Sequence, residues 1–286
     1  MGKVTIGLIN RADEAILSGG NWMASLPLSN LQNRRLSRVA RSTDASDAST
    51  KFDIDLAQAR RIRVVALVAH NLSTSATVRI IGDDENTFAT PLYDSGAVPM
   101  WPAGTIPQDL LEWEDDNFWL GTVSQQAVAG YQAPFICVLP AAVIARYWRV
   151  EISDTGNSDG WVHIGRLYIA DAWQPKHGMR PGVGLGFGDA SAVDASLTGE
   201  EFFEPRRKRR TLSFDLPAMS VTEGYQFALE IDRMAGVTGE VLVIPDPSDS
   251  ENGVRRNFLG RLQSLPALLH SSKRIMSKKY EITEIL

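Results

Sequence analysis

The chain has 286 residues, of which 44% are hydrophobic and 22% charged, a composition that excludes a disordered protein. Its net charge of −5, from 29 basic and 34 acidic residues, argues against a general nucleic-acid-binding protein. The single cysteine, Cys137, rules out a disulfide framework within one chain, and the opening residues lack the pattern of a signal peptide. Without an apolar run of roughly 18 residues, we expect a soluble protein, folded in a reducing cytosol, with no membrane insertion.

The first half of the chain predicts a set of β-strands. Residues 1–50 begin with the strand-like "KVTIGLI" and then become polar, so we expect them to pack on the following domain or on a neighbouring molecule. "KFDIDL" alternates apolar and acidic residues, which is typical of a strand with one buried face. "RIRVVALVAH" is apolar on both faces, which predicts a central strand covered on both sides. After an irregular stretch over 83–134, strands return at "FICVLP", "ARYWRVEISD" and "WVHIGRLYIA".

The second half predicts another β-rich unit with one helix. The Gly- and Pro-rich stretch 174–191 reads as a linker, so we expect a sandwich domain over 51–173 and a second domain over 192–286. "SVTE" is a capping box with Ser220 as N-cap and Glu223 at N3, which predicts a helix over about 220–234. Its apolar face would be formed by Val221, Tyr225, Ala228 and Leu229. The fold class is therefore mainly β.

The sequence predicts no catalytic residue, metal site or cofactor. Its four histidines lack metal-ligand spacing, and neither a nucleophile elbow nor a phosphate-binding loop is found. The acidic stretch "EWEDDNFW" (112–119) is open to three interpretations: a solvated loop, a sugar or protein contact, or, least favoured, a carboxylate pair for glycoside hydrolysis. The basic run "PRRKRR" (205–210) indicates a solvated loop or an intersubunit contact, with nucleic-acid contact as the alternative. The intersubunit candidates are Arg206, Arg207, Lys208, Arg209 and Arg210.

The segment from about Ala40 to Ala172 resembles a discoidin-like, or galactose-binding-like, β-sandwich of the jelly-roll type. The resemblance is carried by "RSTDASDASTKFDIDLAQARRIRVVALVAHNLS", "ARYWRVEISD" and "HIGRLYIAD". It implies that Trp148, Val150 and Ile152 fill the sandwich core and that any sugar binds on loops at one end. The candidate sugar-contacting residues are Trp101, Trp113, Trp119 and Tyr131.

Most of residues 40–286 is also similar to tail proteins of long-tailed bacteriophages, through "ARRIRVVALVAHNLSTSATVRI" and "RRKRRTLSFDLPAMSVTEGYQFALEIDRMAGVTGEVLVIPDP". This resemblance implies a non-enzymatic distal tail or baseplate adaptor that joins the tail tube to the hub or receptor-binding apparatus. Its partners would be a homo-oligomeric, hexameric ring of itself, the tail-tube protein and the hub or fibre proteins, with DNA only passing through the channel.

Such a protein would be located in the virion, at the tail tip, after assembly in the bacterial cytoplasm. In that family the ring-forming domain usually precedes the sandwich, whereas here it follows. The alternative is a carbohydrate-binding protein that recognises a cell-surface glycan of the host, and a third possibility is a glycan-degrading enzyme.

Overall fold

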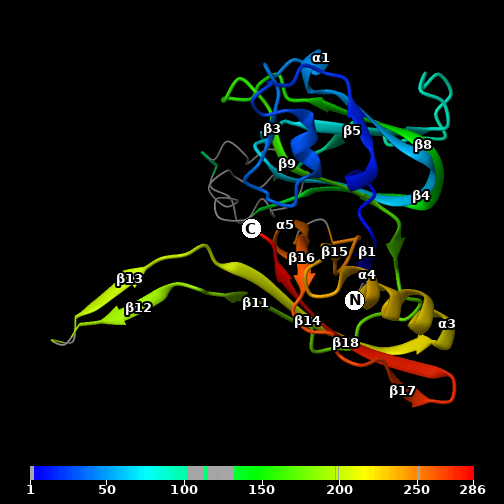
Figure 1. Cartoon of the computed structure of the whole chain (residues 1–286), viewed down its shortest axis with the longest axis vertical. Coiled ribbons are helices and arrows are strands. Elements are labelled where there is room, and N and C mark those ends of the chain that lie inside the picture. Colours follow the sequence, from blue (N-terminus) through cyan, green and yellow to red (C-terminus); the bar gives the residue numbers. More distant parts are fainter. Residues whose placement is uncertain are drawn as a thin grey trace.

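The structure is a computed structural model that describes residues 3–101, 113–114, 121, 132–196, 198, 200–249 and 252–286. The predicted mainly β fold is confirmed: the described strands form two eight-stranded sheets and one two-stranded ribbon, and every strand pair in them is antiparallel. One sheet forms the upper part of the molecule in Figure 1 and the other lies beneath it. No helix among the described residues has the length and apolar character needed to cross a membrane.

The upper sheet folds over itself into a β-sandwich because its two longest strands bend. The register between β4 and β8 shifts after Asp55, and Ala57 in this bend has a positive φ of 62°. The first half of β4 pairs with the second half of β8 in one layer, while its second half pairs with β9 in the other. The strands of this sheet are β2 (Ile16–Ser18), β3 (Ala40–Arg41), β4 (Phe52–His70), β5 (Thr77–Asp83), β6 (Tyr93–Asp94), β7 (Val98–Pro99), β8 (Phe135–Ser153) and β9 (His163–Ala170).

The sandwich core agrees with the strand patterns of the sequence. Trp148, Val150 and Ile152 of β8 are fully or almost fully buried in it, as the resemblance implied. Cys137 is also buried there with a free thiol, and burial raises its pKa. The strand predicted to be covered on both faces is covered on both: Val65 points into the sandwich core, whereas Val64 packs on the lower sheet.

The lower sheet includes the first and the last strand of the chain and follows the order β10-β1-β15-β16-β18-β14-β11, with β17 beside β18. Its strands are β1 (Thr5–Gly7), β10 (Ala172–Trp173), β11 (Gly184–Gly188), β14 (Arg209–Ser220), β15 (Val241–Ile244), β16 (Phe258–Leu262), β17 (Leu269–Ser272) and β18 (Ile275–Glu284). Strand β1 lies between β10 and β15, so the whole sandwich is inserted between the first strand of this sheet and the rest of it.

This arrangement divides the N-terminal segment between the two sheets. The 3₁₀-helices η1 (Ala12–Glu14) and η2 (Leu28–Gln32) contribute side chains to the sandwich core, as does β3, whereas β1 belongs to the lower sheet. The stretch expected to be a linker contains β11, which pairs with β14. The division into separate domains stays a prediction.

The predicted helix is present, and its cap is as expected. The Ser220 hydroxyl accepts a hydrogen bond from the Glu223 N–H at 3.1 Å, and the Glu223 carboxylate accepts one from the Ser220 N–H at 3.0 Å. The helical segment continues as α3 (Val221–Glu223), η4 (Gly224–Leu229) and α4 (Glu230–Ala235) and ends before Gly236, whose φ is 53°.

The prediction of which residues form the apolar face of this helix is wrong in part. Element η4 is a π-helical turn, which shifts the residues after it relative to an α-helix. Ala228 and Ile231 are consequently buried against the sheet, while Tyr225 and Leu229 are exposed.

Two further helices and a ribbon complete the part of the fold that the structure describes. Helix α1 (Asp47–Thr50) precedes β4, and α5 (Gly253–Arg256) precedes β16. Strands β12 (Ala192–Ala195) and β13 (Glu201–Glu204) pair only with each other. This hairpin projects far from both sheets on the left of Figure 1.

Candidate binding site

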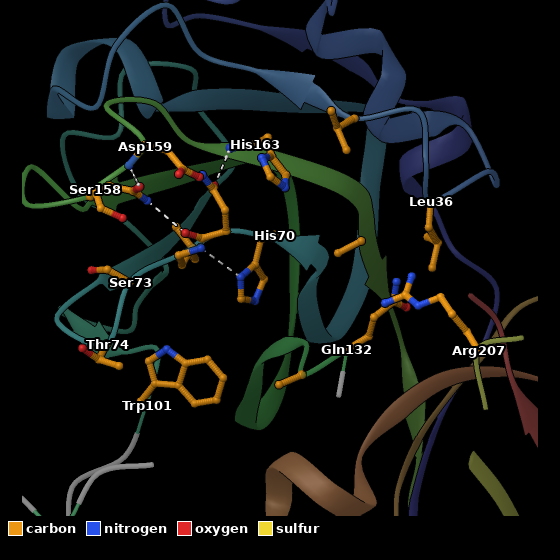
Figure 2. A pocket seen from close by; sticks show the side chains of 16 residues that line it. Leu36, His70, Ser73, Thr74, Trp101, Gln132, Ser158, Asp159, His163 and Arg207 are labelled. Carbon is orange, nitrogen blue, oxygen red and sulfur yellow. Dashed lines mark hydrogen bonds between the residues drawn. The ribbon is translucent and has the colours of Figure 1, made fainter. Parts of the chain in front are cut away.

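A cavity of about 640 Å³ opens at one end of the sandwich, where several connections between strands converge. It lies beside the end of β4, the start of β9 and the segment that precedes β14 (Figure 2). The described residues that line it are Leu36, Val39, Ala69, His70, Asn71, Leu72, Ser73, Thr74, Trp101, Gln132, Ala133, Asn157, Ser158, Asp159, His163 and Arg207.

Asn71 organises the polar wall of this cavity. It follows β4 directly, and its side-chain N–H groups donate to the Asp159 carboxylate at 2.8 Å and to the Trp161 carbonyl at 3.0 Å. Its side-chain oxygen accepts from the His163 N–H at 2.8 Å. One amide thus holds the β8–β9 connection against the end of β4, so Asp159 and His163 have fixed positions on the wall.

A buried carboxylate fixes the neighbouring β4–β5 connection. Asp154 accepts hydrogen bonds from the Ser73 N–H at 2.9 Å, from the Ser73 hydroxyl and from the Asn157 side chain at 2.8 Å. Asn157 also donates to the Asn71 carbonyl at 2.9 Å. Loops tied together in this way keep their polar groups preorganised, which lowers the entropic cost of binding a ligand.

The two histidines of the cavity are both held in the neutral form near pH 7. Burial lowers the pKa of His70 to about 4, and the nearby His163 contributes in the same direction. Burial also lowers the pKa of His163, although the Asp159 carboxylate opposes this effect. The His70 Nδ1 atom accepts from the Leu72 N–H at 3.3 Å, so the neutral ring carries its proton on Nε2.

Trp101 forms the aromatic wall, and His70 lies between it and Arg207 in the view of Figure 2. The Trp101 side chain packs on the sandwich core with 6% exposure. Its Nε1 donor is buried without a hydrogen-bond partner among the described residues, whereas His70 has a backbone hydrogen bond with Ala133 that partly opposes the effect of burial on its pKa. An unpaired buried donor is costly, and water or a polar ligand in the cavity can supply an acceptor for the Trp101 N–H.

Arg207 comes from outside the sandwich, from the segment between β13 and β14, yet it lines the same cavity. It forms no ion pair with a carboxylate of the described residues. The described lining of the cavity therefore combines one cation, one carboxylate, neutral imidazoles, amides, hydroxyls and an indole. This set can hydrogen-bond a neutral polar ligand from several directions.

Of the residues predicted from the sequence to contact a sugar, only some are described by the structure. Trp101 lines the cavity. Trp113 is 73% exposed and is not among the lining residues. Trp119 and Tyr131 lie outside the described residues.

The residues of the basic run 205–210 lie in different environments in the structure. Arg206 pairs with Glu204 at 3.4 Å and Lys208 with Asp189 at 3.8 Å, both on the surface, and Arg209 is exposed at the start of β14. The expectation that Arg210 makes an intersubunit contact is wrong, because its side chain is buried within its own chain. It pairs with Glu284 and donates to the Val254 carbonyl at 2.8 Å and to the Gln132 carbonyl at 2.7 Å.

Among the described lining residues, the sequence singled out only Trp101 and Arg207; those it missed include the polar residues His70, Asn71, Asp159 and His163. A signal was present, because His70 ends a buried strand, Asn71 follows that strand directly and His163 begins β9. Polar residues at strand ends are common sites of function, but nothing local indicates that these ends meet.

No family model and no curated protein matches the chain. Among solved structures, it is similar to the CBM32-1 module of a family 31 glycoside hydrolase from Clostridium perfringens, with 12% identity, a TM-score of 0.38 and coverage of 57% of this chain and 97% of that one. The family 32 module of NanJ from C. perfringens, solved with galactose, has 12% identity, a TM-score of 0.37 and coverage of 59% and 99%.

The lectin domain of lectinolysin, solved with the Lewis B antigen, has 13% identity, a TM-score of 0.38 and coverage of 57% and 96%. The likeness to all three proteins concerns the fold of the sandwich alone.

Proposed function

We propose that the protein binds a carbohydrate in the cavity at the loop end of the sandwich. The observation that carries this proposal is the preorganised polar wall built on Asn71, which faces the indole of Trp101 across a cavity of about 640 Å³. Cavities of this size are typical of sites for small molecules. A saccharide suits the site because its hydroxyl groups can both donate and accept, as the wall requires.

The charge of the wall favours a neutral ligand. The positive charge of Arg207 balances the negative charge of Asp159, and both histidines are uncharged near pH 7 because burial lowers their pKa values. Asp159 is the single carboxylate among the described lining residues, and it is hydrogen-bonded to Asn71. Glycoside hydrolysis usually needs two carboxylates in defined positions, so the described wall supports binding without catalysis.

A glycan array probed with the full chain tests this function, followed by calorimetric titration of the ligands found. Galactose and the Lewis B antigen are the first individual probes, because similar modules were solved with them. We expect Asp159→Asn and Trp101→Phe to weaken binding at least tenfold, since the first replaces a charged acceptor by an amide of the same shape and the second removes the indole N–H together with one ring of the aromatic wall. Trp113→Ala is the matched control and should leave affinity unchanged, because Trp113 is not among the residues that line the cavity.

Thermal melting of each variant would separate lost binding from lost folding. If no glycan binds, or if folded Asp159→Asn and Trp101→Phe bind as tightly as the original protein, the cavity is not a carbohydrate site.

A second candidate function is that of a subunit in an oligomeric assembly. It is favoured by the projecting hairpin, on which Phe202 and Phe203 are 62% and 67% exposed. Exposed apolar clusters of this kind are typical of protein interfaces. The resemblance to phage tail proteins would make that assembly a hexameric ring in the virion, between the tail tube and the hub or fibre proteins. Electron microscopy of the purified protein tests this candidate through the presence of closed rings.

A further inference from the structure

The hairpin β12–β13 exposes apolar side chains on both of its faces. Its register places Val193 opposite Phe203 and Asp194 opposite Phe202. Because successive residues of a strand point to opposite faces, Phe202 and Phe203 lie on different sides of the ribbon. An isolated two-stranded hairpin is at best marginally stable in water, so this one needs a partner. A flat surface would cover only one phenylalanine, whereas a groove can enclose both.

The hairpin is also uniformly acidic. Residues 192–204 contain four carboxylates and no lysine or arginine, and the four are Asp194, Glu200, Glu201 and Glu204. Glu204 is paired with Arg206 of the same chain, whereas the other three form no ion pair with a described residue, and these three favour a partner groove that is basic as well as apolar.

The same chain carries such a groove where the two sheets meet. It has a volume of about 330 Å³ and lies beside the bend of β4, the end of β1 and helix α4. Its lining residues are Leu8, Ile9, Arg11, Ala59, Arg60, Arg61, Asp171 and Met234.

The groove is complementary to the hairpin in both respects. Ile9 and Met234 are 37% and 39% exposed, so they offer apolar surface. Arg61 is paired with Asp171 at 3.3 Å, but Arg11 and Arg60 form no ion pair with a carboxylate of the described residues. The groove offers two guanidinium groups beside apolar side chains, and the hairpin offers two phenylalanines flanked by glutamates, so the two surfaces are complementary in charge and in apolar character.

We propose that the hairpin of one copy of this chain docks into this groove of a second copy. The hairpin projects away from its own two sheets, so its partner is another molecule (Figure 1). The two patches differ, so one copy can offer its hairpin to one neighbour and its groove to another, and the contact can propagate into a ring or a filament. This inference rests on the second candidate function and is independent of carbohydrate binding.

Sedimentation velocity of the full chain with reversed charges tests the docking. The hairpin variant is Glu201→Lys with Glu204→Lys, and the groove variant is Arg11→Glu with Arg60→Glu. We expect the original protein to form oligomers, and each variant to sediment as a monomer because like charges then face each other.

An equimolar mixture of the two variants should restore the oligomers, since each hairpin then meets a groove of opposite charge. Misfolding could not produce this rescue. The matched controls, Lys273→Glu with Arg274→Glu and Asp84→Lys with Glu85→Lys, change the same numbers of exposed charges elsewhere and should assemble normally.

Assembly that is unaffected by both reversals would overturn the docking but leave the assembly function intact. A mixture that stays monomeric would also overturn the docking. An original protein that is monomeric at every concentration would overturn both the docking and the assembly function.

Discussion

The ion pair between Arg166 and Glu240 joins the sandwich to the lower sheet and allows a quantitative test of that junction. Arg166 is completely buried, and its Nε and Nη2 atoms lie 3.0 Å and 2.8 Å from the same Glu240 oxygen. Asp13 makes a second contact with the guanidinium at 2.6 Å, and the Leu31 carbonyl accepts a third hydrogen bond at 3.3 Å. The substitution Arg166→Met removes the cation but retains most of the side-chain volume.

The expected cost follows from the burial of the remaining carboxylate. The Glu240 side chain is only 4% exposed, so without Arg166 its charge would be neither solvated nor paired. Breaking a buried pair in this way costs about 3–5 kcal/mol, a large part of the roughly 5–15 kcal/mol that stabilises a typical protein. The double substitution Arg166→Met with Glu240→Leu should recover most of this loss, because an apolar pair can replace a buried ion pair.

Urea denaturation of the two variants, followed by tryptophan fluorescence, measures these free energies of unfolding. Arg233→Met is the control, since its pair with Glu230 is exposed to solvent and should contribute little to stability. A loss below about 1 kcal/mol for Arg166→Met would refute the reasoning, as would a double variant no more stable than the single one.

Three further predictions concern stability. Burial lowers the pKa of His70 to about 4, so as the pH falls below about 6.5 the unfolded chain takes up a proton at this residue before the folded protein does. Between pH 7.5 and pH 4.5, the original protein should therefore lose roughly 2–3 kcal/mol more stability than the His70→Asn variant, as measured by urea denaturation. An equal loss in both proteins would contradict this. Gly82→Ala would place a Cβ 2.8 Å from the Trp148 ring and should cost about 1–3 kcal/mol in thermal melting, whereas Gly156→Ala, with open space around its Cβ, should cost little. Ser220→Ala removes the helix cap and should cost about 1 kcal/mol by urea denaturation, and an unchanged midpoint would contradict the capping role.

The binding cavity shows how far sequence reasoning extends to a site. Trp101 was selected as a possible sugar contact and Arg207 as a possible intersubunit contact, for unrelated reasons. The structure places both on one cavity. Their proximity depends on how the sandwich and the segment before β14 pack together, and no local pattern records that packing.

Local patterns in the sequence were sufficient for those features that depend on neighbouring residues. Period-two alternation predicted the strand "KFDIDL", whose Phe52 and Ile54 are buried, and the Ser220–Glu223 spacing predicted the helix cap, because both depend on residues a few positions apart. Only the tertiary structure decided that β1 joins the lower sheet, that Arg210 is buried against Glu284 and that the chain carries both an acidic hairpin and a basic groove. These features depend on contacts between residues far apart in the chain, and burial at such contacts is decided by the packing of whole sheets.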